Sequence, residues 1–111
     1  KILLLGITFK ENCPDIRNTK IIDIYTTLNE YTEYITVYDP WANAEQVKHE
    51  YGIDITSKKL EDLKGSFDAI ILGVAHNQFR TMEIRSFLKE ENGVVYDVKG
   101  ILDRKIIDGR L

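Results

Sequence analysis

Apolar residues along the chain cluster in short runs, and segments with helical periodicity separate these runs. The clearest runs cover residues 2–9, 34–39, 67–75 and 94–99. Continuous apolar runs of this length are typical of strands that are covered on both faces in a parallel sheet. A weaker run at residues 53–56 predicts a small edge strand. The pattern therefore predicts about five strands.

Between the runs, the apolar positions follow the spacing of one helical face. The longest such face contains Ile21, Ile22, Tyr25 and Leu28. It predicts a helix that begins near residue 18, with Asn18 or Thr19 as the N-terminal cap. Shorter helical segments are predicted at residues 44–51, 60–63 and 79–88, the last of them in two pieces. Residues 101–111 form a weakly patterned tail.

Strands that alternate with helices predict an α/β fold. The expected architecture is a Rossmann-like three-layer sandwich with a mainly parallel sheet of about five strands and right-handed crossovers. In such sheets, ligands bind beyond the carboxyl ends of the strands, near the point where the strand order reverses. The turns that fall on this edge are residues 10–17, 39–40, 75–77 and 99–100. We expect the functional site there.

Composition narrows the class of protein. The 111 residues amount to one domain, and 43% of them are hydrophobic, which is too apolar for intrinsic disorder. The formal net charge of −3 gives no overall attraction to nucleic acid or to an anionic membrane, so phosphate binding has to be local. No apolar stretch has the ~18 residues that a membrane span needs, which favours a cytoplasmic protein. Because Lys1 directly precedes a buried strand, we expect a domain cut from a longer protein.

The first strand-to-helix connection lacks the glycines of a dinucleotide-binding domain. The fingerprint G-x-G-x-x-G lets the backbone touch a pyrophosphate, and only Gly6 is present here. Asp39 ends the second strand, where such folds often place a ribose-binding acid, but the simpler interpretation is an Asp-Pro turn. The domain is therefore predicted to be Rossmann-like without the cofactor fingerprint.

Cations take the place of the missing glycines. Lys10 and Arg17, before and near the start of a helix, can present an ammonium and a guanidinium to a phosphate or carboxylate. The alternative is that Lys10 is solvated and Arg17 pairs with a surface acid such as Asp15. His76 and Lys99 end later strands, and each can serve either a ligand or a turn.

Cys13 is the only cysteine, so it cannot form an internal disulfide. A nucleophilic cysteine needs a base or a lowered pKa, and no histidine is near it in sequence, which favours a structural role. The two histidines of the chain are not spaced as metal ligands. Composition and spacing thus predict a small anionic ligand at the carboxyl ends of the strands, and no metal.

Four motifs stand at or near this edge. They are Gly6-Ile7-Thr8-Phe9-Lys10, Asp15-x-Arg17, Val37-Tyr38-Asp39-Pro40 and Tyr96-Asp97-Val98-Lys99-Gly100. In order and spacing, over essentially all 111 residues, the chain resembles the C-terminal domain of the UDP-glucose/GDP-mannose dehydrogenase family. The stretch TFKENCPDIRNTK resembles the branch that oxidises UDP-N-acetylhexosamines.

The resemblance implies a three-part enzyme with an N-terminal NAD-binding domain, a central helical region that dimerises, and this substrate-binding domain, residues 1–111. Such enzymes oxidise the C6 alcohol of a UDP-sugar to a carboxylate with two NAD, for surface polysaccharide biosynthesis. Their catalytic cysteine lies in a Gly-rich motif that is absent here, and Cys13 does not match it. We therefore expect the fragment to be inactive alone and the full-length protein to be a homodimer or larger.

The resemblance also assigns roles to individual residues. Phe9, through its backbone, and Lys10 would contact the UDP-sugar, and Arg17 would reach toward NAD held by the other domain. Lys99 stands where the UDP-glucose enzymes carry an arginine that meets the nucleotide sugar. Two alternatives remain open: a stand-alone flavodoxin-like module that binds a phosphate or a partner protein, and a free-standing enzyme that uses Cys13.

Overall fold

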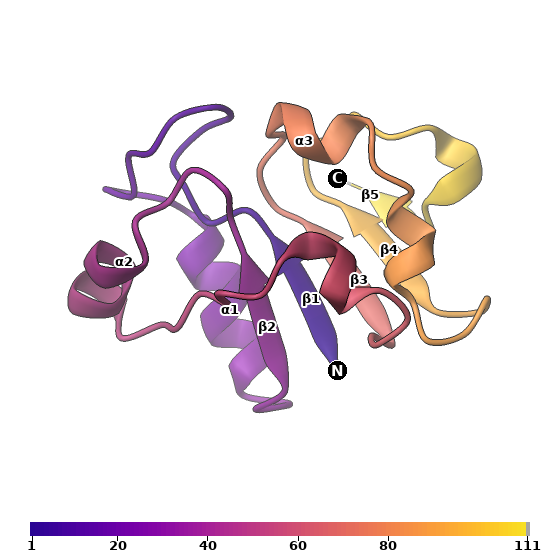
Figure 1. The fold of residues 1–111 in the computed structure, drawn as a ribbon, viewed down its shortest axis with the longest axis horizontal. Coiled ribbons are helices and arrows are strands. Elements are labelled where there is room, and N and C mark those ends of the chain that lie inside the picture. Colours follow the sequence, from indigo (N-terminus) through magenta and orange to yellow (C-terminus); the bar gives the residue numbers. More distant parts are fainter. Residues whose placement is uncertain (111) are drawn as a thin grey trace.

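Residues 1–110 are described by a computed structural model, and within them five strands form one parallel sheet (Figure 1). The spatial order is β2-β1-β3-β4-β5. The strands are β1 (Ile2–Leu5), β2 (Ile35–Tyr38), β3 (Ala69–Leu72), β4 (Val94–Asp97) and β5 (Gly109–Arg110). The helices are α1 (Ile21–Asn29), α2 (Ala44–Tyr51) and α3 (Asn77–Arg80), and the 3-10 helices are η1 (Leu60–Leu63), η2 (Ile84–Phe87) and η3 (Arg104–Ile106).

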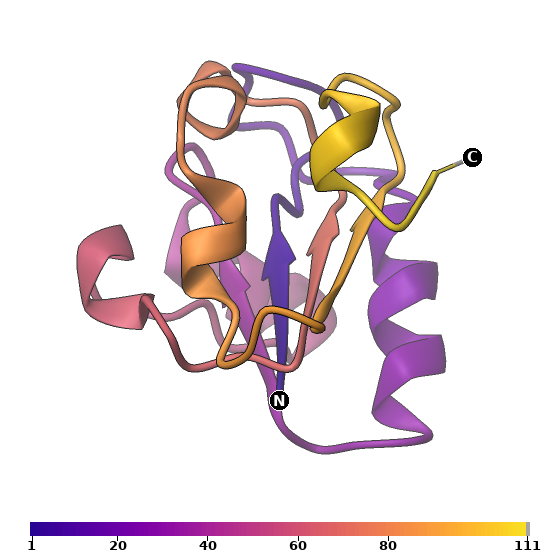
Figure 2. The same cartoon turned by 90° about the vertical axis from the view of Figure 1, so that its right-hand side faces the viewer.

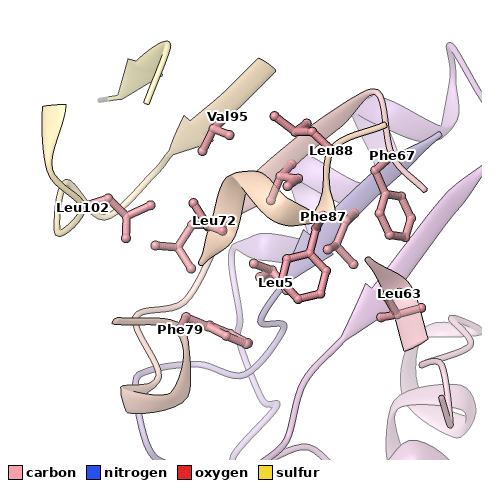
Figure 3. Packing of buried hydrophobic residues seen from close by; sticks show 12 residues of the cluster. Leu5, Leu63, Phe67, Leu72, Phe79, Phe87, Leu88, Val95 and Leu102 are labelled. Carbon is pink, nitrogen blue, oxygen red and sulfur yellow. The ribbon is translucent and has the colours of Figure 1, made fainter. Parts of the chain in front are cut away.

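The sheet is the middle layer of three, as the continuous apolar runs predict. Leu3 and Leu5 of β1 pack into one core cluster with residues of η1, α3 and η2. Figure 3 shows this cluster around Leu5. Leu4, which points to the opposite face, packs with residues of α1 and α2. All three leucines are fully buried, so β1 is covered on both faces. Figure 2 shows α1 on one side of the sheet and η2 on the other.

The strand order reverses between β1 and β3. The chain passes from β1 to its neighbour β2 and then crosses to the other side of β1 to form β3, with Ile2 paired to both Ile35 and Ala69. The carboxyl ends of β1 to β4 lie at one end of the sheet, which we call the carboxyl edge. In Figure 2 this edge carries the loop after β1 and helices α3 and η3. The fold therefore collects the predicted turns where a ligand site is expected.

Two predictions about the strands are wrong. Residues 53–56 form no strand, because Ile55 makes only an isolated parallel bridge to Val37. The fifth strand comes from the weakly patterned tail, for which no strand was predicted and of which residue 111 lies outside the described part. The Asp108 amide donates to the Val95 carbonyl, and the Arg85 guanidinium donates to the Ile106 carbonyl, which holds the tail against β4. Contacts this distant in sequence leave no local pattern.

The helix predictions largely hold. The segment at 79–88 does consist of two pieces, α3 and η2. The capping residue of α1 is Lys20 and makes no side-chain cap, but the preceding Thr19 hydroxyl accepts a hydrogen bond from the Ile21 amide at 3.3 Å. In the part of the chain that the structure describes, no helix has the length and apolar character needed to cross a membrane.

Candidate binding site at the carboxyl edge

Asp39 organises the carboxyl edge from the end of β2. Its Oδ2 accepts hydrogen bonds from the amides of Ile7 at 2.7 Å and Thr8 at 3.2 Å, which fixes the start of the loop after β1. Its Oδ1 accepts from the amides of Trp41 at 2.7 Å and Ala42 at 3.0 Å. The last two contacts are those of an Asx turn, so the Asp-Pro turn interpretation is confirmed.

His76, which follows β3 and is fully buried, is a further hydrogen-bond partner of Asp39. Its Nε2 lies 3.0 Å from the Asp39 Oδ2, and its Nδ1 accepts from the Asn12 amide at 2.9 Å. Because an amide N–H can only donate, Nδ1 is the accepting nitrogen of the ring, and Nε2 is the nitrogen that faces the Asp39 carboxylate as a donor. Burial alone would raise the pKa of Asp39, but hydrogen bonds from His76 and from the amides of Ile7 and Trp41 hold this pKa below its usual value.

The loop at residues 6–20 is held in one conformation by its own polar groups. The Asn12 Oδ1 accepts from the Asn77 amide at 3.0 Å, and the Phe9 amide donates to the Asp15 carbonyl at 2.7 Å. Among residues 1–110, the non-glycine residues with positive φ are Asn12 at +54° and Asn18 at +58°, and both lie in this loop. Unfavourable backbone conformations of this kind concentrate at functional sites.

The crevice where a doubly wound fold binds a dinucleotide is filled in this domain. Gly6 has a φ of +92°, and a Cβ placed on it would lie 2.6 Å from the Cβ of Val74. A Cβ on Gly73 would lie 3.2 Å from the Gly6 carbonyl oxygen. The connections after β1 and β3 therefore touch through their backbones, and both Asp39 oxygens are engaged by the chain itself. No ribose contact of the kind weighed for Asp39 fits this arrangement.

A cavity of about 200 Å³ lies beside this filled crevice. Phe9, Asn18, Lys20 and Lys99 contribute its exposed lining, and the rest comes from Thr19, Ile21 and Val74. These residues belong to the loop after β1, the start of α1 and the turns after β3 and β4. We call this space the Phe9–Lys99 cavity. Its lining holds two lysines and no acid, which suits an anionic ligand.

Asp97, fully buried at the end of β4, positions Lys99, one of the two lysines of this cavity. Its Oδ1 accepts from the amides of Lys99 at 3.0 Å and Gly100 at 2.9 Å, and its Oδ2 accepts from the Leu102 amide at 2.7 Å. The carboxylate thus fixes the backbone that carries the Lys99 ammonium, which remains exposed. Asp97 repeats after β4 the role of Asp39 after β2.

The structure brings together two of the four predicted binding residues. Phe9 and Lys99 share the Phe9–Lys99 cavity, whereas Lys10 is exposed on the loop and is not part of that lining. Arg17 pairs with Asp15 through Nε at 3.0 Å and Nη2 at 3.1 Å, as the alternative interpretation predicts. This hydrogen-bonded guanidinium lowers the pKa of Asp15. The Arg17 side chain is 82% exposed and faces cavities shared with α2.

Sequence reasoning missed two features of this surface. Lys20 lines the Phe9–Lys99 cavity, although it received no binding role as the last residue of the stretch TFKENCPDIRNTK. Cys13, which is half-buried, shares a separate cavity of about 510 Å³ with His49 of α2, 36 positions along the chain. No hydrogen bond between these two side chains is present in residues 1–110.

Fold and cavity together define a class: a Rossmann-like domain whose dinucleotide crevice is filled and whose carboxyl edge carries a cationic cavity. The sequence places the domain more narrowly. Residues 3–104 match the family described as "UDP-glucose/GDP-mannose dehydrogenase family, UDP binding domain". The chain belongs to this family, and the resemblance noted from its motifs is confirmed.

Named relatives agree with this assignment. The chain is 47% identical to a UDP-N-acetyl-D-glucosamine 6-dehydrogenase of Pseudomonas aeruginosa over 100% of its length and 26% of the relative's, and 47% identical to one of Salmonella typhi over 99% and 26%. It therefore spans about a quarter of the length of these relatives. A solved NDP-N-acetyl-D-galactosaminuronic acid dehydrogenase of Methanosarcina mazei Go1 has the same fold, with a TM-score of 0.79 at 18% identity, over 98% of this chain and 24% of that one.

Proposed function

We propose that residues 1–111 are the C-terminal, UDP-sugar-binding domain of an NAD-dependent nucleotide-sugar 6-dehydrogenase that serves surface polysaccharide biosynthesis. The observation that carries the proposal is the Phe9–Lys99 cavity, which joins two motif residues that are 90 positions apart in sequence. The 47% identity to UDP-N-acetyl-D-glucosamine 6-dehydrogenases favours a UDP-N-acetylhexosamine as the substrate. The reaction oxidises the C6 alcohol of the sugar to a carboxylate.

Each proposed binding residue has a distinct task. The Lys99 ammonium neutralises phosphate charge from a turn that Asp97 fixes. The Phe9 amide already donates to Asp15, so Phe9 contacts the substrate through its carbonyl or its ring, which is half exposed. Lys10 extends from the same loop, whose backbone the Thr8 hydroxyl fixes by donating to the Lys10 carbonyl at 3.0 Å. Lys10 contributes its charge as the substrate is enclosed.

NAD, which accepts the hydride in this reaction, does not fit the filled crevice between β1 and β3. We place NAD in the N-terminal domain that precedes this one in the intact enzyme. Arg17 lies on the surface with its guanidinium aligned by Asp15, and we propose that it faces the cofactor across the interdomain cleft. Closure of that cleft excludes water from the hydride transfer.

The domain alone is expected to bind without reacting. The catalytic cysteine and the cofactor-binding glycines belong to the preceding part of the enzyme, and Cys13 lines a different cavity from Phe9 and Lys99. The partners of the domain are therefore the UDP-sugar and its own N-terminal domain. A homodimeric or larger assembly and a cytoplasmic location stay predictions.

The test is an NMR titration of the 111-residue chain with UDP and UDP-N-acetylglucosamine up to millimolar concentration. We expect amide shifts at Phe9, Lys99 and Gly100, and weaker binding by a Lys99→Gln variant. Lys64→Gln is the matched control, because Lys64 is exposed and is not part of the Phe9–Lys99 cavity. Shifts confined to other surfaces, or none at millimolar ligand, would refute the site.

A further inference from the structure

A second cation, Lys20, shares the Phe9–Lys99 cavity; it ends the stretch TFKENCPDIRNTK, but no binding role has been assigned to it so far. Lys20 lines this cavity of about 200 Å³ together with Lys99. The two residues come from different parts of the fold, the start of α1 and the turn after β4. Their convergence on one small space is a property of the tertiary structure, because 79 positions separate them in sequence.

Neither lysine is neutralised within the described part of the chain. The salt bridges of residues 1–110 engage other cations, for example Lys48 with Asp54 at 3.2 Å, and none involves Lys20 or Lys99. The lining of the cavity contains no carboxylate that could separate the two ammonium groups. Two ammonium groups at one small cavity repel each other, whereas an anion bound between them is attracted to both.

The stability of α1 does not explain a lysine at this position. Lys20 occupies the N-cap, makes no side-chain cap and stands at the positive end of the helix dipole, where a cation is unfavourable. The residue two positions earlier, Asn18, adopts a φ of +58° and lines the same cavity. Lys20 thus places an electrostatically unfavourable charge, and Asn18 an uncommon backbone conformation, beside the same cavity.

We propose that Lys20 is a substrate-recognition residue that, together with Lys99, holds the diphosphate of the nucleotide sugar. This inference rests on the proposed function and adds a residue to its site. Two cations match a ligand with two phosphoryl groups better than a ligand with one. Lys20 therefore makes the site selective for UDP over UMP, because only the longer anion engages both ammonium groups at once.

The experiment measures the affinities of the 111-residue chain for uridine, UMP, UDP and inorganic pyrophosphate by NMR titration. The variants are Lys20→Gln, Lys99→Gln and the double variant, with Lys64→Gln as the control for a lost surface charge. Lys20→Gln is expected to weaken UDP and pyrophosphate about tenfold, the loss of one charge-assisted contact, and UMP much less. Uridine affinity is expected to stay unchanged. The exposed position of Lys20 lets the variant fold, which its amide spectrum verifies.

The outcomes separate this inference from the proposed function. If Lys20→Gln binds UDP as tightly as the Lys64→Gln control does, while Lys99→Gln binds UDP more weakly, only the role of Lys20 is overturned. If pyrophosphate binding depends on both lysines and UDP binds no more tightly than pyrophosphate, the two-cation site is supported and the UDP-sugar function is overturned. No binding of either anion by the unaltered chain overturns both.

Discussion

The imidazole of His76 is hydrogen-bonded to the carboxylate of Asp39, with Nε2 3.0 Å from Oδ2, although the two residues follow different strands. The Thr8 hydroxyl lies 3.2 Å from the same ring nitrogen. On the other side of the ring, Nδ1 accepts a hydrogen bond from the Asn12 amide. This buried network therefore connects the ends of β2 and β3 to the loop that carries Phe9 and Lys10.

Replacement of Asp39 by Asn tests how much stability the network contributes. A carboxamide keeps one acceptor oxygen and places an NH2 group where buried amides and the His76 ring now donate. We expect Asp39→Asn to lower the free energy of unfolding by about 3 kcal/mol in urea titrations. Asp54→Asn is the matched control, because Asp54 is 83% exposed and its loss should change stability by at most about 0.5 kcal/mol. Equal effects of the two substitutions would contradict a structural role for the network.

The lowered pKa of Asp39 predicts a loss of stability in acid. In the unfolded chain this carboxyl binds a proton near pH ~3.9, whereas in the folded domain its pKa lies below that value. The unfolded state therefore binds more protons as the pH falls below about 4, and the stabilisation that is complete above this range is lost as the pH falls through the folded pKa. The free energy of unfolding, measured from pH 6 to pH 2.5, should fall less steeply for Asp39→Asn. Parallel profiles for the two proteins would contradict the assignment.

Periodicity could predict the layers of the fold but not the contents of the site. Strands β1 to β4 and helix α1 were recognisable because a buried strand or a helical face leaves a pattern in neighbouring residues. The fifth strand was missed because Arg85 and Val95, distant in sequence, hold it. Phe9 and Lys99 were assigned through the family motifs. Lys20 was not, because only the folded chain shows that it reaches the same cavity.

Asn12 offers a separate test of how the loop after β1 is held. Its φ of +54° favours asparagine or glycine, and its Oδ1 accepts the Asn77 amide. Asn12→Gly removes the side-chain hydrogen bond but keeps a permissive backbone, whereas Asn12→Ala loses both. We expect the alanine variant to be less stable than the glycine variant by about 1 kcal/mol, with faster amide exchange at Asn77 in both. A more stable alanine variant would show that the loop does not need this conformation.

The connections after β1 and β3 are in close contact at the filled crevice, which predicts that a methyl group added at Gly6 destabilises the domain. Alanine at Gly6 would combine a φ of +92° with a Cβ 2.6 Å from the Val74 Cβ and 2.9 Å from the Val74 amide nitrogen. Gly65 has a similar φ of +71° and open space around it, so Gly65→Ala isolates the backbone cost, about 1 kcal/mol. We expect Gly6→Ala to cost at least about 2 kcal/mol more than this control in thermal or urea unfolding. Because one of the two close atoms is backbone, Val74→Ala should not restore stability. Equal costs for the two glycine variants would mean that the crevice is open, and the reason for placing NAD in another domain would be lost.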